Sequence, residues 1–121
     1  MRKLVMLLLL FAGSCNKYDL PKCEFDDATQ DLIWLKDIIE EREANPTDDM
    51  MYCYIVQGKL NKRPVFVLGD CNPLVNKVIF VLDCEGNAIE EDGRKIGANE
   101  VDIKNQKIIW QPENFACDLD L

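Results

Sequence analysis

The hydrophobic period changes near Asn45-Pro46, and this change constrains the fold more than any other feature of the sequence. From residue 28 to residue 44 the apolar residues recur with a helical period. Those that fill one arc of this helix are Leu32, Trp34, Leu35, Ile38 and Ile39, whereas Ile33 falls on the polar side. Asp27 and Gln30 have the spacing of an N-cap and its capping-box partner. Because Pro46 disfavours a helical conformation at Asn45, the sequence predicts one amphipathic helix over 28–44.

After Pro46 the apolar residues follow the period of β-strands. The predicted strands cover 50–57, 63–69, 75–83 and 107–110, with a weak short strand near Ala88-Ile89. The third strand is apolar on both faces, which is typical of a central strand. Short connections require antiparallel pairing. The predicted fold class is therefore α+β, with one amphipathic helix packed on an antiparallel sheet of about four strands.

The N-terminus has the pattern of a cleavable signal peptide. Arg2 and Lys3 precede the apolar run 4–11, and small residues follow before Cys15. As a helix this run would span about 12 Å, whereas the hydrocarbon core of a bilayer is roughly 30 Å thick. The run is therefore too short to be a transmembrane helix. An ordinary signal peptide, in which Cys15 is incidental, would also fit this pattern.

The residues Ala12-Gly13-Ser14-Cys15 resemble the lipobox of bacterial lipoproteins, although Ala12 stands where that family usually has leucine. The resemblance implies that the Cys15 thiol carries a diacylglycerol and that a peptidase removes residues 1–14. Membrane contact would then come from the lipid on Cys15. Asn16 is not the aspartate that commonly retains such proteins in the inner membrane, so the expected location is the outer membrane. Residues 70–74 and 109–115 are similar to short Gram-negative lipoproteins, a resemblance that implies no function.

The length of 121 residues favours a single domain. The expected organisation is a lipoprotein signal peptide over 1–14, a lipidated tether over 15–25, one α+β domain over 26–117 and an acidic tail over 118–121.

The charge of the chain limits its partners. The formal net charge is −8, and without Arg2 and Lys3 the processed chain would keep 12 basic against 22 acidic residues. Such a chain repels nucleic acid and anionic lipid surfaces. It contains no histidine, the commonest general acid–base group and metal ligand. We therefore expect no metal, no cofactor and no Ser-His-Asp site.

Five cysteines follow Cys15 in an oxidising compartment, where disulfides are permitted. They are Cys23, Cys53, Cys71, Cys84 and Cys117. In a hairpin centred near residue 62, Cys53 lies opposite Cys71, which makes Cys53–Cys71 the favoured disulfide. Cys84 is expected at the opposite edge, and Cys117 as the free thiol. The alternative is that these cysteines are buried free thiols.

The acidic residues give no defined catalytic or calcium motif. In the stretch 83–94, Cys84 and Ala88 interrupt the ligand spacing of an EF-hand, and Arg94 occupies its twelfth position. Paired carboxylates, as at Glu40-Glu41, arise without function in a chain with 22 acidic residues. The sequence therefore favours a non-enzymatic binding or interaction module in the cell envelope. The alternatives are an inhibitor or chaperone-like partner of an envelope enzyme, and a small carboxylate-based hydrolase.

Overall fold

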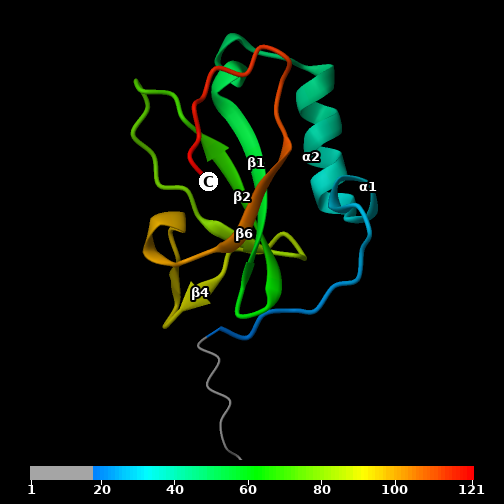
Figure 1. Ribbon diagram of the computed structural model, residues 1–121, viewed down its shortest axis with the longest axis vertical. Helices are drawn as coiled ribbons and strands as arrows, with labels where there is room; N and C mark the ends of the chain where they lie inside the picture. The colour runs from blue at the N-terminus through cyan, green and yellow to red at the C-terminus, as the bar shows by residue number, and fades with distance from the viewer. Residues whose placement is uncertain (1–17) are drawn as a thin grey trace, which may run out of the picture.

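A four-stranded antiparallel sheet forms the centre of the molecule, with the helices on one face (Figure 1). The computed structural model describes residues 18–121. The strand order is β3-β2-β1-β6, formed by Val81–Asp83, Arg63–Asp70, Cys53–Leu60 and Lys104–Trp110. A separate two-stranded hairpin consists of β4, Glu90–Glu91, and β5, Arg94–Lys95. This arrangement confirms the predicted α+β class.

The predicted helix is present but is divided at Leu32. Helix α1 covers Ala28–Asp31 and α2 covers Ile33–Ala44, because Leu32 takes an extended conformation. The side chain of Asp27 accepts a hydrogen bond from the Thr29 N–H, which confirms Asp27 as the N-cap. The predicted box partner Gln30 is wrong. Asp31 takes that role, because its Oδ2 accepts from the N–H groups of Asp26 and Asp27, and these bonds lower the pKa of Asp31.

A two-residue turn fixes the register of the central hairpin. Asn61 and Lys62 both have positive φ, 52° and 66°, as a type I′ turn requires. Leu60 therefore pairs with Arg63, and Cys53 pairs with Asp70 at the far end.

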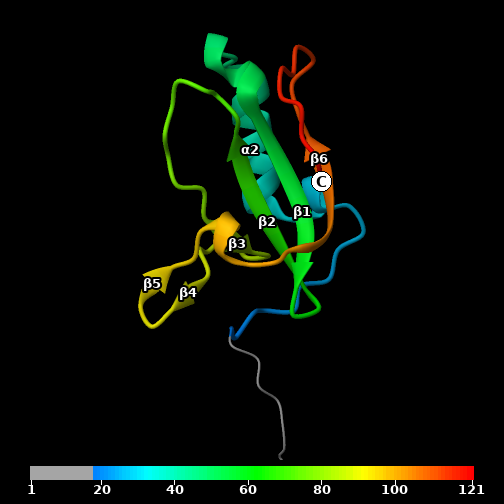
Figure 2. The same ribbon diagram turned by 60° about the vertical axis from the view of Figure 1, so that its left-hand side comes forward.

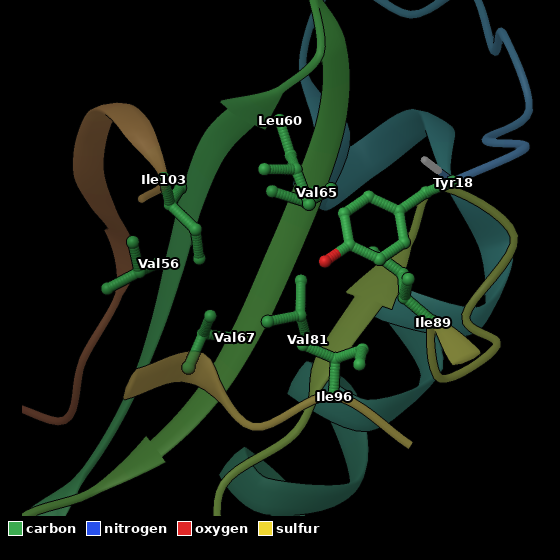
Figure 3. Packing of buried hydrophobic residues seen from close by; sticks show 9 residues of the cluster. All are labelled: Tyr18, Val56, Leu60, Val65, Val67, Val81, Ile89, Ile96 and Ile103. Carbon is green, nitrogen blue, oxygen red and sulfur yellow. The ribbon is translucent and has the colours of Figure 1, made fainter. Parts of the chain in front are cut away.

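Alternating side chains of β1 and β2 build one hydrophobic cluster on each face of the sheet. Ile55 and Phe66 face the helices and pack with Leu35. On the other face lie Val56, Val65 and Val67, covered by Val81, Ile89, Ile96 and Ile103 (Figure 3). Tyr18 is only 8% exposed, and its ring points into this second cluster (Figure 3).

The predicted tether is wrong from Tyr18 onward. Tyr18 is buried, Leu20 packs beside it, and Cys23 forms a disulfide with Cys84. Aromatic and disulfide contacts thus hold residues 18–25 on the domain, although this segment shows no regular hydrophobic period. Cys15 and residues 16–17 lie outside the described residues.

Several strand boundaries differ from the prediction. Residues 48–52 form a 3₁₀ turn, η1 (Asp48–Tyr52), so β1 begins only at Cys53. The third predicted strand is wrong as a central strand, because β3 covers only Val81–Asp83 and lies at the edge of the sheet. Residues 71–80 leave the sheet as a loop, and residues 75–80 of it belong to the segment that was predicted as strand. The final strand is confirmed and begins three residues earlier than predicted, at Lys104.

Candidate interaction surface

The loop 71–80, between β2 and β3, exposes a cluster of apolar side chains. Leu74 is 92% exposed, Val78 65% and Val75 46%. The loop projects from the upper half of the domain, away from the end at which Tyr18 enters (light green in Figures 1 and 2). A single exposed apolar side chain needs no explanation, whereas three of them on one loop make this loop the candidate interaction surface.

The first part of this loop is held rigidly to the domain. A disulfide joins Cys71 to Cys117, with a Cα–Cα distance of 6.0 Å. Asn72 donates its N–H to Asp70 Oδ1, and its own Oδ1 accepts from the Leu74 N–H, each over 2.9 Å. Lys77 Nζ lies 2.9 Å from Asp70 Oδ2. These contacts reduce the conformational entropy that the loop would lose on binding a partner.

Asp70 stays ionised because of its partners. Burial raises the pKa of Asp70, but hydrogen bonds from Lys77 and the Asn72 N–H, with the charges of Lys77 and Arg42, lower it by more. The net direction is downward, so the ion pair with Lys77 persists well below neutral pH. Burial, and then the charge of Asp70, raise the pKa of Tyr54, which keeps the Tyr54 phenol neutral.

An open groove of about 600 Å³ runs between the loop and the 3₁₀ turn η2, Ala98–Glu100. It is lined by Tyr54, Val67, Asn76, Lys77, Val78, Ile79, Ala98, Asn99 and Glu100. The Tyr54 ring lies across Gly69, where a Cβ would come within 2.1 Å of the ring, so glycine is required at that position. Glu100 is paired with Arg94 and accepts from the Gly97 N–H. The groove therefore combines apolar walls with charges that are already compensated.

A second hollow, of about 480 Å³, lies between the end of α2 and the residues after β6. The Arg42 guanidinium lies 5.3 Å from the centre of the Trp110 ring, and Trp110 Nε1 donates to Glu43. Arg42 Nη1 has no hydrogen-bond partner among the described residues and is buried below the surface. A ligand in the open hollow therefore could not reach this atom. Trp110 packs against the helix-facing cluster.

The favoured disulfide Cys53–Cys71 is wrong, and so is the expectation of a free Cys117. The structure joins Cys23 to Cys84 and Cys71 to Cys117, which leaves Cys53 free. The disulfide prediction failed because the register of the β1–β2 hairpin differs from the expected one by one residue. Cys53 pairs with Asp70, so Cys71 is directed to the opposite face of the sheet from Cys53.

The remaining predicted site residues, Ala12, Gly13, Ser14 and Cys15, lie outside the described residues. Within residues 18–121 no group of three or more His, Cys, Asp or Glu side chains could hold a metal ion. In the same part of the chain, no helix combines the length and apolar character needed to cross a membrane. The sequence signal that could have identified the loop is Leu74-Val75 directly after Asn72-Pro73, an apolar pair at a turn.

Comparisons of the chain with protein-family models, with curated proteins and with solved structures gave no match.

Proposed function

We propose that the chain is a lipid-anchored lipoprotein of the cell envelope and that its domain is a non-enzymatic module that binds another envelope protein. The observation that carries this proposal is the loop 71–80, whose apolar side chains are exposed on a rigid base. The lipobox-like residues Ala12–Cys15 supply the anchor, and the outer membrane is the proposed location.

The loop surface fits an apolar segment of a protein partner. Leu74 and Val78 offer side chains that lose water on contact, and each would contribute the free energy of apolar burial. The exposed residues Asp48 and Asp49 belong to η1, whose last residue, Tyr52, accepts a hydrogen bond from the N–H of Cys71 at the start of the loop. We therefore expect a partner with an apolar segment flanked by basic side chains. The carboxylates of Asp48 and Asp49 would attract those basic side chains and repel other acidic proteins.

A second candidate function is a protein inhibitor or chaperone-like partner of an envelope enzyme. The bracing of the loop by Cys71–Cys117 and Asp70–Lys77 favours it, because an inhibitory loop must keep its shape while bound. Stoichiometric loss of one enzyme's activity in the complex would distinguish this function from simple docking.

We expect the double substitution Leu74→Asp and Val78→Asp to abolish partner binding without unfolding the domain. The matched control is Ile33→Asp, because Ile33 is also an exposed apolar residue, 73% exposed, but lies on α2. The measurement is quantitative mass spectrometry of proteins cross-linked to the lipoprotein in intact envelopes. One protein should be recovered in stoichiometric amount with wild type and Ile33→Asp, and lost with the loop variant. Equal recovery from all three proteins would contradict the role of the loop.

Cys15→Ala should remove the anchor. The resemblance to lipoproteins implies that lipid attachment precedes cleavage, so the variant should accumulate as an uncleaved precursor or leave the membrane as a soluble product. The measurement is membrane fractionation after a carbonate wash, with Cys53→Ala as the control for loss of another unpaired cysteine. If the Cys15 variant is processed and stays with the membranes as wild type does, the anchor lies elsewhere.

A further inference from the structure

Four cationic side chains gather at the end of the domain that is farthest from the loop 71–80. Lys59, Lys62 and Arg63 come from the end of β1, the turn and the start of β2, and Lys22 comes from the N-terminal segment. All four line one shallow hollow of about 470 Å³. Lys22, Lys59 and Lys62 are exposed, and none of the four forms an ion pair within residues 18–121. This group is called the basic patch below.

The basic patch stands out against the charge of the chain. The whole sequence carries a net charge of −8, but only two carboxylates, those of Glu24 and Asp26, line the same hollow. Asp19 lines a neighbouring hollow with Asn61 and Arg63, so four cationic side chains face three carboxylates around the turn and the local charge is positive. The expectation that the chain repels anionic lipid was based on its net charge, which does not describe this hollow.

The same end of the domain lies nearest to the proposed anchor. Tyr18 is buried beside Leu60 and Val65 (Figure 3), and it lines a small hollow together with Asn61 of the β1–β2 turn. Only two residues separate Tyr18 from Cys15. Because consecutive Cα atoms are 3.8 Å apart, the Cα atom of Cys15 lies within about 11 Å of that of Tyr18. A lipid on Cys15 would therefore hold this end of the domain at the bilayer surface.

We propose that the basic patch binds the phosphate groups of anionic lipids and holds the domain in a fixed orientation on the membrane. Lys and Arg side chains near an anionic surface attract it over a distance of about one Debye length. With the basic patch on the membrane, the loop 71–80 points away from it, toward proteins in the compartment. This inference rests on the proposed lipid anchor.

The test uses the lipidated protein purified from membranes and reconstituted into vesicles of phosphatidylcholine, with or without phosphatidylglycerol. A membrane-impermeant amine reagent modifies exposed lysines, and mass spectrometry measures the rate at each one. We expect Lys22, Lys59 and Lys62 to react about fivefold more slowly when phosphatidylglycerol is present, which is the effect of one lysine at an anionic surface. Lys77 on the loop should react at the same rate in both vesicles, and molar salt should remove the difference.

A matched pair of variants separates the basic patch from general charge. The double substitution Lys59→Glu and Lys62→Glu should abolish the phosphatidylglycerol-dependent protection of Lys22. The pair Lys36→Glu and Lys77→Glu makes the same change of net charge at residues that do not line this hollow and should preserve it. Equal protection of Lys22 in both kinds of vesicle, or protection by inorganic phosphate alone, would contradict the proposal.

The intact mass of the same preparation distinguishes failure of the basic-patch proposal from failure of the lipid-anchor proposal. Lipid on Cys15 without phosphatidylglycerol-dependent protection contradicts the basic patch and leaves the anchor standing. A chain without lipid on Cys15 contradicts both the anchor and the orientation derived from it.

Discussion

Leu35→Asp should destabilise the domain by at least about 3–5 kcal/mol, the upper range for removal of a buried leucine side chain. Leu35 is 0% exposed and packs between α2 and the sheet, beside Ile55 and Phe66. A carboxylate there would be buried without a partner, which adds its desolvation to the lost apolar contacts. The total is a large share of the 5–15 kcal/mol that is typical of whole domains.

The measurement is urea unfolding of wild type, Leu35→Asp and Ile33→Asp. Ile33→Asp makes a similar chemical change on the same helix, but Ile33 is 73% exposed, so this variant should unfold close to wild type. Equal unfolding midpoints for the Leu35 and Ile33 variants would mean that this face of α2 is not packed on the sheet.

Replacing both Cys23 and Cys84 with serine should cost about 4 kcal/mol. The disulfide closes a loop with a sequence separation of 61 residues, and the chain-entropy model assigns about this free energy to a loop of that length. Cys84 is also 1% exposed, so serine would place a hydroxyl in the helix-facing cluster. The control is Cys53→Ser, which removes a cysteine that has no disulfide.

Thermal unfolding of these variants, together with peptide mapping under non-reducing conditions, provides the check. Mapping should recover Cys23 joined to Cys84, Cys71 joined to Cys117, and Cys53 unmodified. A peptide that links Cys53 to Cys71 would contradict the register of the central hairpin. If the double variant melts at the same temperature as Cys53→Ser, the disulfide does not contribute to holding the N-terminal segment on the domain.

The helix and its first cap were predictable because they depend on local rules. The arc that contains Leu35 and Ile39 predicts the buried face, and Asp27 has the spacing of an N-cap. The break at Leu32 was not predictable, because a buried leucine fits the helical period equally well whether its backbone is helical or extended. The strands β1 and β2 were predicted to within a few residues by their alternating pattern.

The disulfides were not predictable, because a shift of one residue in a hairpin exchanges the two faces of the strand. The turn at Asn61-Lys62 is centred half a residue before position 62, and that difference separates Cys53 from Cys71. Cys117 and Cys23 pair with distant cysteines through irregular segments, which carry no periodic signal. Such pairings depend on the tertiary packing of the chain ends.

Residues 75–80 of the loop were predicted as strand because their apolar residues are typical of a core strand. Val75, Val78 and Phe80 fit the two-sided apolar pattern of a central strand, yet they are exposed. An apolar run that the fold leaves in solvent conflicts with the general rule of burial, and such conflicts concentrate at functional sites. The basic patch was hidden for a similar reason, because its four side chains meet only when the β1–β2 turn packs beside Lys22.

Site-specific photo-cross-linking at Leu74 in living cells tests most directly whether the loop binds a protein partner. A photoreactive residue at position 74, which is 92% exposed, should give one discrete adduct of higher mass. The same residue at position 33 on α2, also exposed, should give none. Identical adducts from both positions, or no adduct from position 74, would contradict the proposal that the loop 71–80 is the docking surface of this domain.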